Sequence, residues 1–183
     1  MRIIAGRFKG RRLTAPTWDG LRPSSDKLRE TLFNVLAPRL TGARVLDLCA
    51  GTGAVGLEAL SRGAALVIAV DTDTRAVALA RRNAETCGVT ADYTIQTGDV
   101  LTALPRLDAA GPFDIIYLDP PYAFARTREV LQAAVPLLHS EGLLVLERAT
   151  RAEPDVPDLL VRVRDIRSGD STLTLLARRT EVL

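Results

Sequence analysis

Residues 119–122, Asp119-Pro120-Pro121-Tyr122, place an acidic side chain, two prolines and an aromatic ring directly after an apolar run. That run, residues 113–118, has the length and composition of a buried strand. A carboxylate at the carboxyl end of a strand lies where open α/β sheets bind ligands. Because proline fixes φ and restricts the residue before it, the pair makes a stiff, extended exit. The four residues therefore predict an acceptor, a rigid carbonyl and a ring face in one crevice; the alternative is an ordinary strand end with a packed tyrosine.

A glycine-rich segment after another apolar run could hold a cofactor. It reads Asp47-Leu48-Cys49-Ala50-Gly51-Thr52-Gly53 and leads from an expected strand into an expected helix. Gly51 and Gly53 permit the tight turn and close backbone approach that a cofactor needs. With Gly56 they also spell the nucleotide-binding pattern Gly-x-Gly-x-x-Gly. The segment predicts either a tight turn alone or a cofactor loop lined by Asp47, Ala50, Gly51 and Gly53.

Two further strands also end in acidic residues. Asp71 follows an apolar run about 20 positions after the glycine segment, where a carboxylate can accept hydrogen bonds from ribose hydroxyls. Asp99 could meet the exocyclic amine of an adenine, or it could simply cap a helix. The expected cofactor residues outside the glycine segment are Asp71, Thr72, Asp99, Val100 and Asp119.

Two cofactors fit an adenosine-shaped slot of this kind, a nicotinamide dinucleotide and S-adenosylmethionine. A dinucleotide brings its pyrophosphate to the N-terminus of the helix, where the carboxylate of Asp47 would be unfavourable. The same carboxylate attracts a sulfonium cofactor that carries an α-amino group. Asp47 therefore favours S-adenosylmethionine, with S-adenosylhomocysteine as the product.

Length and composition limit the class of protein. The chain has 183 residues, enough for one domain, and its 47% hydrophobic and 25% charged residues are typical of soluble globular proteins. No apolar run is long enough to span a bilayer, and the N-terminus has no signal-peptide pattern. The two cysteines, Cys49 and Cys87, have no metal-ligand spacing. We expect a cytoplasmic protein with no metal and no membrane partner.

The charge is unevenly distributed along the chain. Residues 1–44 hold ten basic and three acidic residues, a net +7, whereas residues 45–183 hold fourteen basic and nineteen acidic residues, a net −5. A basic segment on a mildly acidic body indicates a polyanionic partner, and the alternative is a solvated basic surface.

Apolar periodicity predicts the elements that position these residues. Residues 2–14 suggest a small hairpin or extended arm, and Ser24 or Ser25 can cap a helix that ends near residue 36. The expected strands beyond it are residues 45–48, 66–70, 93–95, 113–118, 142–147, 159–163 and 172–176. The expected helices are residues 54–62, 74–86, 100–107 and 127–138.

Repeated βα units followed by a terminal hairpin predict an α/β fold. We expect a mostly parallel, seven-stranded sheet flanked by helices, with an antiparallel strand near one edge. A small basic N-terminal extension, a hairpin plus a helix over residues 1–41, precedes a cofactor-binding catalytic domain over residues 42–183.

These motifs occur in the order seen in class I S-adenosylmethionine-dependent methyltransferases that act on amino groups, and Asp-Pro-Pro-Tyr at residues 119–122 is the specific part of this resemblance. The N-terminal sequences resemble the RsmD family of bacterial 16S ribosomal RNA guanine-N2 methyltransferases. They are Arg2-Ile3-Ile4-Ala5-Gly6-Arg7, Gly10-Arg11-Arg12-Leu13, Gly20-Leu21-Arg22-Pro23 and Arg29-Glu30-Thr31-Leu32-Phe33-Asn34. Residues 56–64 fit the same family, and the resemblance covers nearly the whole chain. Thr52, where the family often has serine, is a mild departure.

The resemblance implies a Rossmann-like class I methyltransferase that methylates the exocyclic N2 amine of one guanine in 16S ribosomal RNA. It implies that the Asp119 carboxylate and the Pro120 carbonyl accept the N–H groups of that amine. Tyr122 would stack on the base, with Pro121 completing the motif. The alternatives are a methyltransferase acting on N6 of DNA adenine, a nicotinamide-dependent oxidoreductase and a non-catalytic RNA-binding factor.

The expected partner is 16S ribosomal RNA, within the small subunit or an assembly intermediate, bound by a monomer. Basic residues of the N-terminal extension would hold its phosphates, and affinity would fall steeply with salt. The candidates are Arg7, Lys9, Arg11, Arg12 and Arg22. Trp18 could stack on RNA or cover the core.

Overall fold

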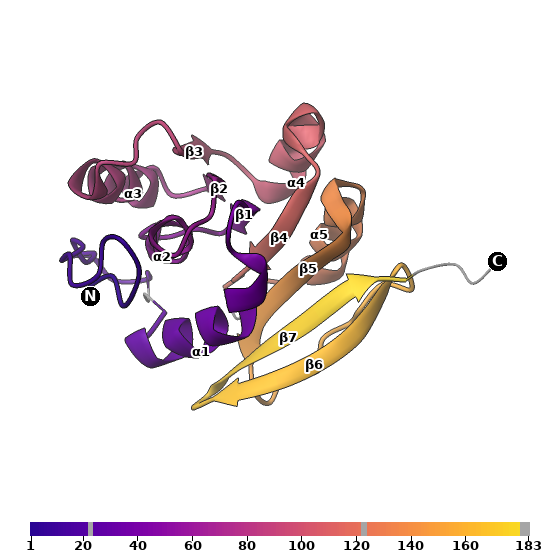
Figure 1. Cartoon of the computed structure of the whole chain (residues 1–183). Helices are drawn as coiled ribbons and strands as arrows, with labels where there is room; N and C mark the ends of the chain where they lie inside the picture. The colour runs from indigo at the N-terminus through magenta and orange to yellow at the C-terminus, as the bar shows by residue number, and fades with distance from the viewer. Residues whose placement is uncertain (22–23, 122–123, 180–183) are drawn as a thin grey trace.

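A computed structural model describes residues 1–21, 24–121 and 124–179 of the chain. Its centre is a seven-stranded sheet in the order β3-β2-β1-β4-β5-β7-β6 (Figure 1). Strands β1 to β5 are parallel, and β7 pairs antiparallel with both β5 and β6. The mostly parallel sheet with an antiparallel strand near one edge is thus confirmed. The strands are β1 (Arg44–Leu48), β2 (Leu66–Asp71), β3 (Tyr93–Thr97), β4 (Phe113–Leu118), β5 (Leu138–Ala149), β6 (Leu160–Ser168) and β7 (Ser171–Arg178).

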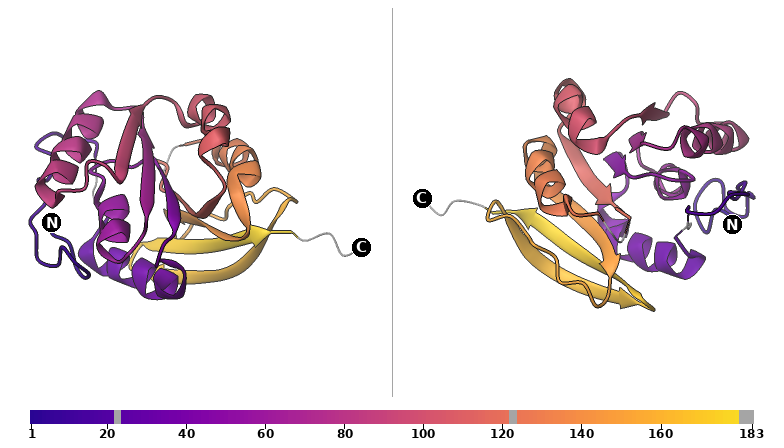
Figure 2. Two further views of the ribbon diagram at one scale, coloured as in Figure 1. Left: turned by 45° about the horizontal axis from the view of Figure 1, so that its top comes forward. Right: turned by 180° about the vertical axis from the view of Figure 1, so that it is seen from behind.

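Helices cover both faces of the sheet (Figure 2). Helices α1, α2 and α3 pack on one face, here called the α1–α3 face, and α4 and α5 pack on the other. Strands buried on both sides explain the nearly continuous apolar runs in the sequence. The helices are α1 (Asp26–Leu36), α2 (Ala54–Ser61), α3 (Thr74–Cys87), α4 (Val100–Ala103) and α5 (Thr127–Ala134). Within the described ranges, no helix has the length and apolar character needed to cross a membrane.

Two helices end earlier than the sequence periodicity predicts, and each stops beside a proline. The helix expected over residues 100–107 ends at Ala103, and a 3-10 helix (Leu104–Ala110) with Pro105 in its first turn follows. The helix expected over residues 127–138 ends at Ala134, before the 3-10 helix Val135–Leu137 that contains Pro136. Proline lacks the N–H that an α-helix needs at an interior position, so the α-helical hydrogen bonding stops there.

The order of the strands locates the ligand-binding edge of the sheet. The chain proceeds outward from β1 through β2 to β3, and then crosses back to lay β4 on the other side of β1. In open parallel sheets, such a reversal leaves a crevice outside the carboxyl ends of the strands. Leu48 at the end of β1 pairs with both Val70 of β2 and Leu118 of β4. The glycine segment and Asp119 therefore follow adjacent strands at the same edge.

The N-terminal extension is a small loop closed on itself and packed against the body. Arg2 and Arg12 form an antiparallel bridge, and Ile3 exchanges backbone hydrogen bonds with Arg11 and Gly10 at 2.9 Å each. This arrangement matches the expected hairpin. The following helix, α1, starts after Ser25, whose side chain accepts from the Leu28 N–H, as predicted. Ile3, Phe8 and Leu13 belong to the same apolar cluster as α2 and α3. A domain boundary between residues 41 and 42 stays a prediction.

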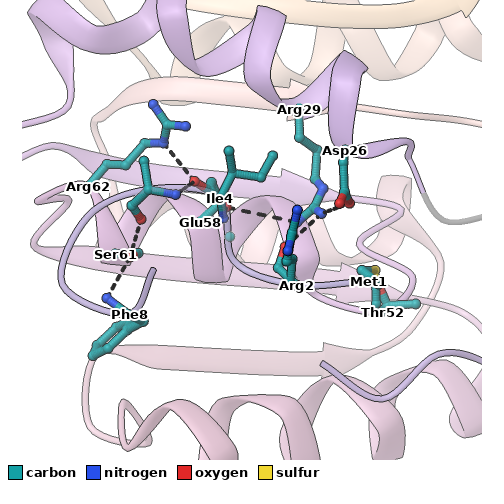
Figure 3. Close-up of polar contacts among 12 residues, drawn as sticks. Met1, Arg2, Ile4, Phe8, Asp26, Arg29, Thr52, Glu58, Ser61 and Arg62 are labelled. Carbon is teal, nitrogen blue, oxygen red and sulfur yellow. Dashed lines mark hydrogen bonds and ion pairs between the residues drawn. The ribbon is translucent and has the colours of Figure 1, made fainter. Parts of the chain in front are cut away.

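A buried carboxylate holds the first residues of the extension (Figure 3). Glu58 of α2 is fully buried and accepts hydrogen bonds from the backbone N–H groups of Ile4 (2.8 Å) and Ala5 (3.0 Å). Its charge is balanced by Arg62 at 2.7 Å and by the buried Arg29 at 3.9 Å. A buried charge is tolerated only when it is paired and hydrogen-bonded, so these contacts fix the extension to α2.

Candidate active site

The glycine segment forms a tight loop between β1 and α2. Gly51 and Gly53 have φ values of 55° and 75°, and Gly53 is the N-cap of α2. A Cβ atom at Gly53 would lie 2.6 Å from the hydroxyl oxygen of Tyr93 on β3. Only glycine combines this conformation with such a close approach. The predicted strand-loop-helix geometry is therefore present.

Asp71, at the end of β2, supports this loop. One carboxylate oxygen accepts from the Gly51 N–H at 2.8 Å, and the other accepts from the Asp73 N–H at 2.9 Å. A carboxylate oxygen has two lone pairs, so both oxygens retain acceptor capacity for the hydroxyls of a ribose. The exposed Thr72 lies next to it in the chain. The expected ribose contact therefore stays a prediction that the geometry permits.

Asp99 caps the start of α4, which is one of the two roles expected for it. Its carboxylate accepts from the Thr102 N–H at 3.2 Å, at the start of α4. It also lies 4.0 Å from Arg126, and its side chain is about two-fifths exposed, at 42%. The neighbouring Val100 is buried. Because the Asp99 carboxylate is partly exposed, it can still accept from an adenine amine, and that role stays a prediction.

Asp47 lies beneath the glycine loop. It is 1% exposed, and its carboxylate accepts from the Gly56 N–H at 3.1 Å. Burial, with a smaller contribution from Asp71, raises the pKa of Asp47 to about 7, while the Gly56 hydrogen bond opposes the rise. Asp47 therefore supports α2 from within the fold, and its direct contact with a cofactor stays a prediction.

Asp119 follows β4 beside this loop. Its backbone N–H donates to the Leu48 carbonyl at 3.3 Å, which ties the end of β4 to the end of β1. Burial raises the pKa of Asp119 to about 8, and the nearby carboxylates of Glu147 and Asp47 contribute to the rise. Pro120 is half-buried and Pro121 is exposed. Tyr122, the expected stacking residue, lies outside the described residues.

Four carboxylates surround the turn after β1. Burial and then the charges of Asp71, Asp119, Asp47 and Asp99 raise the pKa of the Cys49 thiol in this turn to about 12. The crevice thus gathers acidic groups from four separate segments, and two of them, Asp47 and Asp119, have pKa values raised to about 7 and 8. A negative crevice fits a cofactor with a sulfonium and an ammonium group, and it disfavours a pyrophosphate.

The structure also brings in residues that the sequence patterns did not single out. The Tyr117 hydroxyl donates to the carboxylate of Glu147 on β5, and the Ser171 hydroxyl on β7 donates to the same carboxylate at 3.1 Å. The Ser24 hydroxyl lies 3.5 Å from it. Glu147 could have been found, because it follows an apolar strand in the same way as Asp119. Ser24 and Ser171 carried no such signal.

The segment before α1 passes over the glycine loop. The guanidinium of Arg75, in the first turn of α3, lies 5.1 Å above the Trp18 ring. The Leu21 side chain would be 3.0 Å from a Cβ atom at Gly51. Ser24 reaches Glu147. The N-terminal extension therefore contributes to the walls of the crevice, and Trp18 packs on the body near α3.

Arg7, one of the basic candidates of the extension, lies away from Asp119. Arg7, Lys9, Arg11 and Arg12 are exposed, and Arg22 lies outside the described residues. Arg7 forms an ion pair with Asp92, just before β3, at 3.8 Å. The amino end of β3 is opposite the edge that carries Asp119, roughly 20 Å away for strands of this length. RNA would therefore have to span the side of the molecule to contact both.

Comparison with known proteins identifies close relatives. Residues 1–177 match the family described as Conserved hypothetical protein 95. The chain is 36% identical over 163 residues to Ribosomal RNA small subunit methyltransferase D of Escherichia coli, covering 89% of this chain and 79% of that protein. It is 34% identical to YlbH of Bacillus subtilis over 183 residues, covering 98% and 100% of the two chains. The solved structure of Escherichia coli yhhF is 33% identical and aligns with a TM-score of 0.83 over 97% of both chains.

Proposed function

This chain belongs to the Conserved hypothetical protein 95 family, the RsmD family, and on that premise we propose that it is an S-adenosylmethionine-dependent methyltransferase of 16S ribosomal RNA. Its target is the exocyclic N2 amine of one guanine. The substrate is the small ribosomal subunit or an assembly intermediate, and the enzyme acts as a monomer in the cytoplasm.

The observation that carries this proposal is that Asp71 and Asp119 follow strands beside β1 and lie at the glycine loop, where Asp71 accepts from the Gly51 N–H and the Asp119 N–H donates to the Leu48 carbonyl. S-adenosylmethionine supplies an electrophilic methyl group on a sulfonium and carries an α-ammonium group, so the cofactor is cationic where this crevice is anionic. Asp71 and Thr72 would hold the ribose, and Asp99 and Val100 would hold the adenine. Ala50, Gly51 and Gly53 would line the path of the amino-acid portion, with Asp47 supporting them from below.

Asp119 and Pro120 would present the target amine. The lone pair of a guanine N2 amine is delocalised into the ring, which makes it a poor nucleophile. The Asp119 carboxylate and the Pro120 carbonyl would each accept one N–H, which favours a pyramidal nitrogen whose lone pair points away from both acceptors. Tyr122 would stack on the base and Pro121 would keep the exit from β4 rigid. The protein thus accelerates transfer chiefly by positioning, and the guanine must be unpaired or flipped.

Basic side chains would hold the RNA beside this crevice. Arg7, Lys9, Arg11, Arg12 and Arg22 are the proposed phosphate contacts. All of them come from the extension, whose residues before α1 also wall the crevice. Binding of the backbone and presentation of the base would therefore be linked through one segment.

Incubation with radiolabelled S-adenosylmethionine and a panel of nucleic acids tests the proposal. The panel contains free 16S ribosomal RNA, isolated small subunits that lack the modification, and duplex DNA. We expect label in the ribosomal RNA samples and none in DNA. Label confined to DNA would instead support a DNA adenine methyltransferase. Tight RNA binding with no label anywhere would support a non-catalytic RNA-binding factor.

A further inference from the structure

A second buried carboxylate stands next to Asp119 on the neighbouring strand. In the pairing of β4 with β5, Leu118 lies opposite Leu146, so that Asp119 and Glu147 each follow a paired residue. Adjacent strands are about 4.8 Å apart. Tyr117 and Val145 both point to the α1–α3 face, and side chains alternate along a strand, so Asp119 and Glu147 point to that face too. The register therefore places the two carboxyl groups side by side.

Three hydroxyl groups from different segments meet Glu147. Tyr117 of β4 donates to one carboxylate oxygen, and Ser171 of β7 donates to the other at 3.1 Å. Ser24, before α1, lies 3.5 Å from the oxygen that Tyr117 contacts. Glu147 is 7% exposed. These hydrogen bonds satisfy both oxygens of the buried carboxyl group and fix its place on β5.

Building on the proposed methyl transfer, we propose that Glu147 is a positioning residue that acts through Asp119: its carboxyl group, held on the adjacent strand by three hydroxyl groups, makes Asp119 a stronger proton acceptor. Packing alone does not explain a carboxyl group here, because an apolar residue would pack beside Tyr117 without needing three hydroxyl partners.

The reaction requires such an acceptor. A bond forms between the amine nitrogen and the methyl carbon, and the bond between that carbon and the donor sulfur breaks. The nitrogen then carries a positive charge until it loses one proton. Asp119, which already accepts an N–H of the amine, takes that proton and later releases it to water. A neighbouring negative charge strengthens the hold of Asp119 on the proton.

The charges around Asp119 support this role for Glu147. The titratable groups that face Asp119 are Glu147 from β5, Asp47 from β1, Cys49 after β1 and Tyr117 from β4 itself. After burial, Glu147 is the largest contributor to the raised pKa of Asp119, ahead of Asp47, whereas the Ser24 hydroxyl lowers it. No described basic side chain counters these charges among the contacts of the pair.

The test is a carbon-13 NMR titration of the Asp119 side-chain carboxyl in the cofactor-free protein. We expect Glu147→Gln to lower the pKa of Asp119 by about one pH unit or more. The control, Glu141→Gln, changes an exposed glutamate on the same strand and should leave it unaltered. In the wild-type protein, the Asp119 signal should titrate near pH 8, well above the range of an ordinary aspartate. A wild-type midpoint near pH 4 would overturn the proposal even if the variant does not fold.

The pH dependence of methyl transfer gives the second readout. Glu147→Gln should move the acid limb of the single-turnover rate to lower pH and lower the plateau, because Asp119 becomes a weaker base. If Glu147→Gln lowers the rate but shifts neither the acid limb of the pH–rate profile nor the pKa of Asp119, then Glu147 only supports the fold and the proposal is wrong. If the wild-type protein methylates no RNA, the proposed function fails, while the NMR titration still decides whether the pair is coupled.

Discussion

Asp119 occupies a position where two requirements conflict. A carboxylate must be ionised to accept a proton, yet burial and two nearby carboxylates favour the neutral form and raise its pKa to about 8. On the proposed mechanism, the crevice needs a strong acceptor at that point. The folded state is weakened when Asp119 ionises, because a buried charge without a counter-ion is unfavourable.

The stability of an Asp119→Asn variant should reveal that cost. The folded pKa lies above the usual value, so the contribution of Asp119 to stability is fully present below about pH 4 and is lost as pH rises through about 8. The variant should match the wild-type melting temperature near pH 4 and exceed it by about 3 °C or more at pH 9. Differential scanning calorimetry across this range measures the difference. Asp108→Asn, at an exposed position, is the control, and an equal effect at both sites would contradict the argument.

At the level of elements, sequence patterns located the strands and the acidic residues that follow them. Continuous apolar runs identified β1, β2 and β4, and Asp47, Asp71 and Asp119 were placed on them correctly because strand ends are local features. Helix lengths were wrong where Pro105 and Pro136 interrupt α4 and α5, although proline was visible in the sequence. The apolar periodicity continues past both prolines, so periodicity alone predicts helices that are too long.

Contacts between distant elements could not be predicted from one sequence. The Arg29–Glu58 pair joins residues 29 positions apart, and the Tyr117–Glu147 hydrogen bond depends on the pairing of β4 with β5. Neither residue type nor spacing specifies such partners. The burial of Asp47 was also missed, because the sequence shows that a carboxylate follows a strand but not which side of the loop it lies on.

Removal of the Glu58 carboxylate should release the N-terminal extension. Glu58→Ala removes the acceptor for two backbone N–H groups and leaves the buried Arg29 with Asp26 as its remaining ion-pair partner, so we expect a loss of about 3 kcal/mol in the free energy of unfolding. Urea denaturation measures this loss. Hydrogen exchange at the Ile4 and Ala5 amides should accelerate more than exchange within the sheet. Glu85→Ala, an exposed residue on α3, is the control, and similar losses for both variants would refute the assignment.

At the level of the whole molecule, the basic extension wraps from one edge of the sheet to the other. Arg7 lies near the amino end of β3, whereas Met1, Leu21 and Ser24 reach Thr52, Gly51 and Glu147 at the carboxyl edge. Not every basic residue is available to a ligand, since Arg29 is buried and paired. Arg7, Lys9, Arg11 and Arg12 are exposed, and on the proposal above they are the basic residues that contact RNA.

The double variant Arg11→Ala and Arg12→Ala should weaken RNA binding without affecting the cofactor. Each lost phosphate contact reduces the slope of log affinity against log salt by roughly 0.7 to 0.9, so the pair should reduce it by about 1.5. Fluorescence anisotropy at several salt concentrations measures the slope, and calorimetry with S-adenosylhomocysteine measures the cofactor site. Arg164→Ala with Arg167→Ala on β6 is the matched control. An unaltered slope for the first pair would exclude these residues from the RNA contact.

The most direct test of the central claim is mass spectrometry of nucleosides from 16S ribosomal RNA methylated by the purified protein. The account predicts one methyl group per molecule, recovered as N2-methylguanosine, and none with Asp119→Ala, whose fold and affinity for RNA should be retained. Methylation at another atom of guanine, at another base or on ribose, or full activity of Asp119→Ala, would contradict the assignment of this crevice as a site that presents an exocyclic amine.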